Sequence, residues 1–169
     1  KYDEACKRMW EYYLLSCARR LDRTGDIDRY QAALASKSPK SPWRLEALIS
    51  EGNHHLLANR ISEYVPLFKA CYESFPDGER GDYCHWKVAW AEYMQRRAGA
   101  SALLREHLTL FPGSEKASAA LYFLGRLAES SRARSAARSY YDRIEKISPN
   151  SYYGMLARDR LEEPSLARA

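Results

Sequence analysis

The sequence predicts an all-α fold, a right-handed superhelical array of antiparallel helix pairs. Proline recurs at Pro42, Pro76, Pro112 and Pro149, at intervals of 34, 36 and 37 residues, which is the period of a helical repeat. Between these prolines the apolar residues follow a helical period. β-Structure has no support, because the chain contains only two Val and two Thr and no segment of alternating polarity.

The composition is that of a folded chain. Of the 169 residues, 46% are hydrophobic, 29% are charged and 12% are aromatic, which excludes a disordered protein. The length suits one domain or a short repeat array. No apolar run approaches the roughly 20 residues that span a bilayer, so we expect no membrane span. The net charge of +5 permits acidic partners, but nucleic acid binding rests on that charge alone and is not expected.

Residues 1 to 41 are predicted to form an N-terminal helical hairpin and a linker. The apolar face of the long first helix contains Met9, Trp10, Tyr13, Leu14, Cys17, Ala18 and Leu21. The turn at residues 23–26 ends this helix, and Asp26 or Asp28 can cap a short second helix that runs through Leu34. Residues 37–42 read as a linker.

Residues 42 to 161 are predicted to contain the repeats, and residues 162 to 169 form a tail. Ser41 followed by Pro42 is an N-cap with proline at the first helical position. The helix that follows is expected to stop at Gly52, and the stretch 54–74 must kink at Pro66 or form two shorter helices.

Two further helix pairs follow in this prediction. The helical spacing of Trp86, Ala89, Trp90 and Tyr93 marks one first helix, and its second helix runs over residues 100–111. In the next pair the first helix contains Leu121, Leu124, Gly125 and Ala128, and the inner side of the second, 132–147, contains Ala136, Ala137, Tyr140, Tyr141, Ile144 and Ile147. The expected N-caps are Asp82, Ser114 or Ser118, and Ser151.

The last complete repeat resembles the tetratricopeptide pattern. If Leu121 is its fourth position, the remaining places are filled by Leu124, Gly125, Ala128, Ala137, Tyr141, Ile144 and Pro149. The resemblance implies that the two helices cross closely at Gly125, since a larger side chain would hold the backbones apart. The preceding repeat fits less closely, because Trp86 and Ala89 are displaced by two residues.

Four segments carry a more specific resemblance: residues 85–93 (HWKVAWAEY), 111–114 (FPGS), 119–126 (AALYFLGR) and 148–161 (SPNSYYGMLARDRL). Over about half of the chain, residues 83–161, the sequence resembles the helical superhelix that precedes the catalytic domain in soluble lytic murein transglycosylases. This resemblance implies a periplasmic, non-catalytic scaffold without a cofactor that positions the enzyme or its glycan substrate. A catalytic domain is then expected downstream of Ala169 in a longer parent chain.

The catalytic glutamate of that family is followed by serine, and two pairs invite comparison. Glu73–Ser74 lies at the end of a repeat, and neither it nor Glu129–Ser130 is followed by the family's downstream Gly-Leu-Met-Gln motif. A general acid also needs a desolvated cleft that raises its pKa. We therefore expect no catalytic residue in this chain.

The cysteines do not suggest a metal site, because no pair has C-x-x-C spacing. Cys6 and Cys17 lie on one helix, too far apart to bond. Cys71 and Cys84 flank the turn at 75–81, so an antiparallel helix pair would bring them close together. Either a disulfide in an oxidising compartment or two reduced, buried thiols fits this spacing. The four histidines are expected to serve packing or the surface.

In tetratricopeptide-like geometry, the first helix of each pair lines the concave face. By register this resemblance selects six binding candidates: Lys87, Met94, Gln95, Tyr122, Arg126 and Glu129. Lys87 and Arg126 are placed to meet the carboxylates of peptidoglycan stem peptides. The alternative partner is an envelope protein, bound by a protein–protein interaction scaffold of the tetratricopeptide type.

Overall fold

The computed structural model describes residues 2–76 and 80–167, and within these residues every regular element is a helix. The helices are α1 (Tyr2–Arg20), α2 (Thr24–Lys37), α3 (Pro42–Leu57), α4 (Ile61–Ser74), α5 (Gly81–Met94), α6 (Ala100–Leu110), α7 (Ala117–Ser130), α8 (Arg134–Ile147), α9 (Tyr152–Glu162) and α10 (Pro164–Ala167). The predicted all-α class is confirmed.

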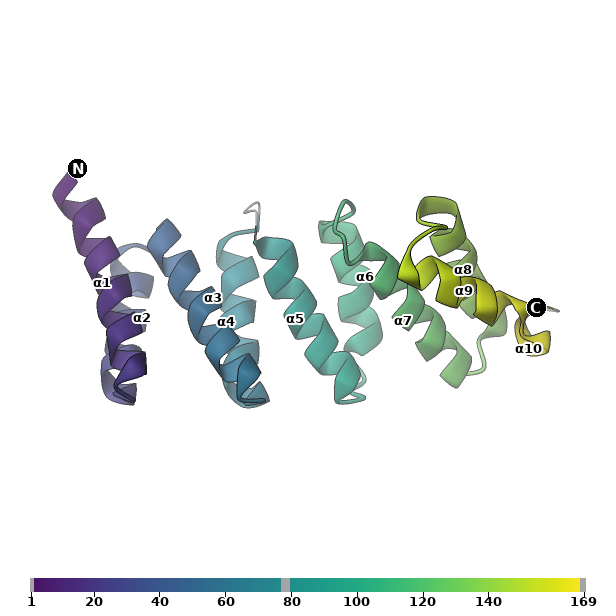
Figure 1. Ribbon diagram of the computed structural model, residues 1–169, viewed down its shortest axis with the longest axis horizontal. Coiled ribbons are helices and arrows are strands. Elements are labelled where there is room, and N and C mark those ends of the chain that lie inside the picture. The colour runs from purple at the N-terminus through teal and green to yellow at the C-terminus, as the bar shows by residue number, and fades with distance from the viewer. Residues whose placement is uncertain (1, 77–79, 168–169) are drawn as a thin grey trace. The chain divides into compact units, whose positions relative to one another are not determined.

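The chain divides into two compact units, Lys1–Val88 and Ala89–Ala169, with the boundary inside α5. Within the first unit α1 packs on α2 and α3 packs on α4; within the second, α7 contacts α6, α8 and α9. Consecutive helices in these pairs lie side by side and reverse direction at short turns (Figure 1).

One turn recurs four times between the two helices of a pair. Asp22, Asn59, Arg96 and Arg132 adopt positive φ angles of 54°, 54°, 54° and 62°. In each case the next amide donates to the carbonyl five residues earlier, for example Arg97 N to Glu92 O at 3.1 Å. This bond satisfies a carbonyl at the end of the first helix. The described residues therefore repeat a local structure every 36 or 37 positions.

The turns between pairs recur as well, and they correct one predicted repeat mark. The C-cap residues of the second helices are Ser38, Phe75, Phe111 and Ser148. Their φ angles all lie between −130° and −153°. Proline follows each of these residues, so the mark in the first pair is Pro39. Pro42, chosen from its sequence interval, instead occupies the first position of α3.

The buried face of α1 differs from the prediction. Ala18 is buried as predicted, but Leu15, which lies outside the predicted face, is also buried and forms a core cluster with Leu34 of α2 and Ala47 of α3. In contrast, Trp10 is 61% exposed and Leu21 is 63% exposed. The buried side of α1 also includes Tyr12, which packs against this cluster, so it lies partly outside the predicted face.

The predicted stop at Gly52 is wrong, because α3 continues to Leu57. Gly52 lies inside the helix and packs on α4, where an added Cβ would lie 2.8 Å from Phe68 Cε1. The glycine therefore serves a close helix contact and not a helix end. The stretch 54–74 does form parts of two helices, but the turn between them lies at residues 58–60 and not at Pro66, which lies inside α4.

Some predicted caps are confirmed and others are wrong. Ser41 accepts a hydrogen bond from Trp43 N at 3.3 Å, and Ser151 accepts one from Gly154 N at 3.0 Å, so both cap their helices. Asp26 and Asp82 instead lie within the first turns of α2 and α5. Ser118 lies inside α7. In these cases the backbone turn begins the helix earlier than the polar residue suggests.

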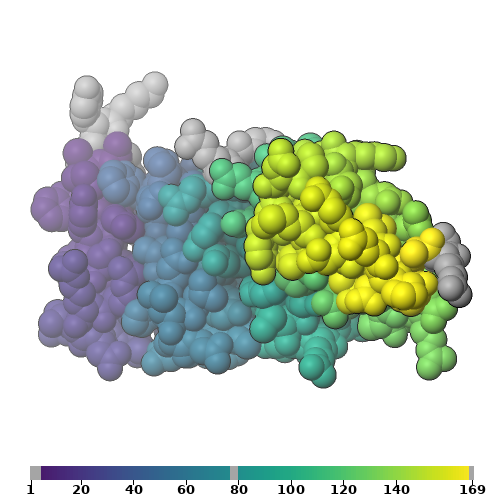
Figure 2. Space-filling model, turned by 45° about the vertical axis from the view of Figure 1, so that its right-hand side comes forward, coloured from purple at the N-terminus to yellow at the C-terminus, as the bar shows by residue number. Residues whose placement is uncertain are grey.

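The second unit has its core where α7, α8 and α9 meet. Tyr141 and Ile144 of α8 are fully buried against Leu121 of α7 and Ala157 of α9. A Cβ on Gly125 would lie 2.5 Å from Tyr141 Cε1, which explains the need for a small residue at this crossing. Two residues predicted to face inward, Ala136 and Ile147, are exposed. Figure 2 shows the yellow C-terminal helices lying against the yellow-green atoms of α8.

In the part of the chain that the structure describes, no helix combines the length and apolar character needed to cross a bilayer.

Candidate functional site

Two of the predicted binding residues, Met94 and Arg126, line one hollow in the second unit. Its volume is about 610 Å³, and its lining residues come from the end of α5, the following turn and α7: Tyr93, Met94, Arg96, Arg97, Arg126, Leu127 and Ser130. We call this the arginine hollow. Three of its lining side chains carry positive charge and none carries negative charge, so the hollow favours an anion.

The recurring turn after α5 supplies two of the arginines. Arg96 occupies the left-handed position of this turn, and its amide donates to Tyr93 O at 2.9 Å. Arg97 follows and forms an ion pair with Glu92 at 3.6 Å. Backbone hydrogen bonds at the helix end thus fix the main-chain positions of both residues. Helical register does not predict Arg96 and Arg97 as binding residues. The pair of consecutive arginines shortly after the end of an apolar helix could have indicated them from the sequence.

Arg126 projects from the exposed side of α7. A hydrogen bond with the Tyr122 side chain raises the pKa of Arg126, and this effect exceeds the opposing effect of burial. Arg126 therefore stays charged at any physiological pH. Tyr122 was also expected on the exposed face, but only 7% of it is exposed, because its ring packs against Tyr141 and Tyr153.

Tyr93 forms the aromatic wall of the arginine hollow. Its ring stacks on Trp90 with centroids 5.5 Å apart, and its centroid lies 4.7 Å from that of Phe123. Burial raises the pKa of the Tyr93 hydroxyl, and the positive charge of Arg126 opposes part of that rise. The hydroxyl therefore remains protonated and available as a donor at neutral pH.

Glu129 bridges three helices beside the hollow. It accepts hydrogen bonds from the Tyr141 hydroxyl of α8 at 2.5 Å and from Arg160 Nε of α9 at 3.1 Å, and a second Arg160 nitrogen also donates to it. Burial alone would raise the pKa of Glu129, but the hydrogen bonds from Arg160 and Tyr141 hold it below its usual value. A carboxylate held in its ionised form suits an interhelical bridge and is poorly suited to donate a proton.

The remaining concave-face candidates have different surroundings. Lys87 belongs to the first unit, where its ammonium lies 5.0 Å from the centroid of the Tyr83 ring. Gln95 is half-buried, and its side-chain oxygen has no hydrogen-bond partner within the described residues. Of the six candidates, the arginine hollow therefore brings together Met94 and Arg126, with Glu129 one helical turn from Arg126.

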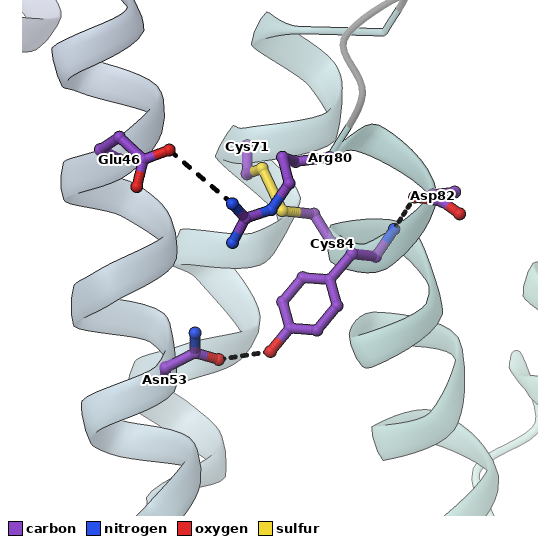
Figure 3. The surroundings of a disulfide bond; sticks show 7 residues. Glu46, Asn53, Cys71, Arg80, Asp82 and Cys84 are labelled. Atoms are coloured by element: carbon purple, nitrogen blue, oxygen red, sulfur yellow. Dashed lines mark hydrogen bonds and ion pairs between the residues drawn. A yellow bond between two sulfur atoms is a disulfide. The ribbon is translucent and has the colours of Figure 1, made fainter.

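The structure joins Cys71 of α4 to Cys84 of α5 in a disulfide, with their Cα atoms 6.1 Å apart (Figure 3). Next to it, Tyr83 donates from its hydroxyl to Asn53 of α3 at 2.5 Å. Arg80 forms an ion pair with Glu46 of α3 at 3.8 Å. These contacts connect the start of α5 to both helices of the preceding pair, so the disulfide belongs to the frame of the first unit.

A second polar hollow, of about 410 Å³, lies in the first unit. At its base the buried carboxylate of Glu51 receives a hydrogen bond from Arg19 at 3.2 Å, and His55 Nε2 lies 3.4 Å from it. Acidic and basic residues are mixed around this hollow, so it has no single charge preference. It links the first helix pair to the second.

Glu73 and Glu129, the two glutamates that are followed by serine, both lack the surroundings of a general acid. Glu73 is more than half exposed and pairs with Lys69 at 3.7 Å. Among the described residues, no group of three or more histidine, cysteine or acidic side chains is arranged to hold a metal ion. Because Arg96, Arg97 and Arg126 line the arginine hollow, anion binding is the chemistry that it supports best.

No protein-family model matches the chain, and a search of curated proteins finds no significant similarity. A functional proposal therefore rests on the residues and their arrangement.

Proposed function

We propose that this chain is the non-catalytic helical scaffold of a bacterial lytic transglycosylase and that it positions the enzyme or its glycan substrate on peptidoglycan. In this proposal the helix pairs continue as a right-handed, tetratricopeptide-like superhelix in the periplasm. The catalytic domain lies downstream in the parent chain.

The arginine hollow is the observation that carries the proposal. Peptidoglycan presents free carboxylates on its stem peptides, and guanidinium groups bind carboxylates through paired, charge-assisted hydrogen bonds. Arg96, Arg97 and Arg126 line the hollow, no acidic side chain is among the lining residues, and Glu92 pairs with one of the three arginines, Arg97. The resemblance of residues 83–161 to the transglycosylase superhelix adds support, because this range contains the whole hollow.

The recurring turns support the scaffold part of the proposal. Four helix pairs share the left-handed residue and the same backbone hydrogen bond at the end of their first helix. Repeated pairs of this kind gain stability from their neighbours and provide extended surfaces. Such a surface holds a ligand or a second domain in place.

A second candidate, a protein–protein interaction scaffold of the tetratricopeptide type, draws on one observation. Met94 is 59% exposed and lies beside the arginines, so the hollow offers an apolar contact as well as charge. A peptide segment of an envelope protein would use both.

Retention on purified murein sacculi tests the first candidate. We expect the wild-type chain to co-sediment with sacculi and Arg126→Glu to lose most of this retention, because the substitution introduces a negative charge into the hollow. Arg143→Glu makes the same charge change at an exposed position of α8 outside the hollow. This matched control should be retained like the wild type.

Absence of wild-type retention on sacculi would contradict the proposal, as would equal retention of all three proteins. Capture of one defined envelope peptide without retention on sacculi would favour the second candidate. The sequence that encodes the region downstream of Ala169 gives an independent check, since the first candidate requires a catalytic Glu-Ser motif there.

A further inference from the structure

We propose that the arginine hollow recognises the free carboxylates of a stem peptide and does not recognise the sugar rings of the glycan. This inference rests on the proposed function, which it deepens by naming the ligand group. It follows from the charges, the aromatic packing and the size of the hollow.

The charges are arranged for more than one carboxylate. Arg97 forms an ion pair with Glu92, whereas Arg126 forms its hydrogen bond with the Tyr122 side chain and has Glu129, which is already held by Arg160, one helical turn away. Arg96 and Arg126 both lie close enough to Tyr93 to act on its hydroxyl electrostatically. Both arginines line the same hollow as this hydroxyl. A stem peptide carries several free carboxylates on a short chain, which matches two arginines in one hollow.

The aromatic side chains at the hollow are packed against one another. The ring of Tyr93 is stacked on Trp90, and the centroid of Phe123 lies 4.8 Å from that of Trp90 and 4.7 Å from that of Tyr93. Tyr122 is buried among other aromatic rings. A sugar platform needs an exposed aromatic face, whereas Tyr93, the aromatic residue that lines the hollow, is half-buried and already packed against two other rings.

The remaining lining residues suit a peptide. Met94 and Leu127 offer apolar contacts to small side chains, and Ser130 adds a hydroxyl. A hollow of about 610 Å³ lies within the range of small-ligand sites, about 300–1,000 Å³, and so accommodates a short peptide segment.

Calorimetric titration of the whole chain with a disaccharide tetrapeptide tests the inference. Three comparison ligands accompany it: the same muropeptide with its peptide carboxylates amidated, the disaccharide without peptide, and tetra-alanine, which has a single carboxylate. Because each comparison ligand lacks charge-assisted hydrogen bonds that the disaccharide tetrapeptide can form, we expect at least about tenfold weaker binding for each of them.

The protein variants are Arg96→Gln with Arg126→Gln, and Arg143→Gln as the matched control. We expect the double variant to bind the tetrapeptide at least about tenfold more weakly and the control to bind like the wild type. Circular dichroism and a thermal melt verify that both variants are folded. Glutamine keeps much of the length and polarity of arginine, and both replaced side chains are exposed, so we expect no loss of structure.

Four results would overturn the inference: equal affinity for the peptide-free disaccharide, equal affinity for the amidated ligand, equal affinity for tetra-alanine, or unchanged binding by the double variant. Competition by inorganic phosphate at a concentration equal to that of the tetrapeptide would also overturn it, since the hollow would then be a general anion site. If Arg126→Glu loses retention on sacculi while the double variant binds the disaccharide tetrapeptide like the wild type, the inference fails and the proposed function stands. If the wild type binds the tetrapeptide but not sacculi, the proposed function fails.

Discussion

At the scale of single residues, Glu129 shows how one side chain joins three helices. Its carboxylate, located on α7, accepts from Tyr141 of α8 and Arg160 of α9. The periodicity of the sequence predicts the buried position of Tyr141, but it does not predict its polar partner. The interhelical bridge depends on which residues of α9 approach α7, and this approach is set by packing over a distance of 31 residues along the chain.

The lowered pKa of Glu129 gives a pH-dependent contribution to stability. A carboxyl whose pKa is lower in the folded state stabilises the fold above its unfolded pKa, about 4.3, and this stability is lost as the pH falls through the lower folded value. We expect Glu129→Gln to lower the midpoint of urea unfolding at pH 7 and the difference from wild type to shrink below about pH 4. A difference that stays constant over this pH range would contradict the prediction.

Gly125 lies at a helix crossing that leaves no room for a larger side chain. Because its Cβ would approach Tyr141, we expect Gly125→Ala to reduce the free energy of unfolding by about 1–3 kcal/mol, measured by urea denaturation. Gly25, a glycine of α2 with no atom near its Cβ position, is the matched control. We expect Gly25→Ala to be neutral or stabilising by up to about 1 kcal/mol, because alanine favours the helix. Equal destabilisation by both substitutions would contradict the close crossing.

At the scale of helices, periodicity predicts that a helix exists better than which side of it is buried. Residues 2–20 are helical as expected, but Leu15, outside the predicted face, is fully buried, whereas Trp10 and Leu21 of that face are exposed. Likewise, Gly52 reads as a stop in the sequence and is a packing site in the structure. In both cases the deciding factor is a neighbouring helix, which the local sequence does not contain.

The disulfide between α4 and α5 closes a loop of 13 residues. For a loop of about this size, we expect its removal by Cys71→Ser with Cys84→Ser to cost about 3 kcal/mol in the free energy of unfolding. A urea titration with and without reductant measures this cost in the wild type. The control, Cys6→Ser with Cys17→Ser, removes two exposed free thiols and should leave the midpoint unchanged. If reductant has no effect on the wild type, the disulfide does not stabilise the chain.

At the scale of the whole molecule, the recurrence of the turns was the most predictable feature. The proline spacing predicts a repeat of about 36 residues, and the left-handed turns of the structure recur every 36 or 37 residues. The arginine hollow was only half predictable. Arg126 and Met94 follow from helical register, whereas Arg96 and Arg97 lie beyond the last helical residue of α5. Register arguments do not extend into a turn.

The net charge of +5 leads to a prediction for the intact chain. Since salt shortens the range of exposed charges to about 10 Å at about 0.1 M, we expect retention on sacculi to fall as sodium chloride increases from about 0.05 M to about 0.5 M. Co-sedimentation at several salt concentrations measures this dependence, and Arg126→Glu should show a shallower one. If retention does not change with salt concentration, apolar contacts and not the arginines hold the chain on the sacculi.

The two free cysteines give an unusual experimental opportunity. Cys6 and Cys17 are exposed on one helix, while the other two cysteines are buried and bonded to each other. Thiol-reactive spin labels will therefore attach at only these two positions of the native sequence. Eleven residues of α-helix separate them by about 16 Å, a length that dipolar spectroscopy resolves, so unwinding of α1 would register as a longer interspin distance without any engineered mutation.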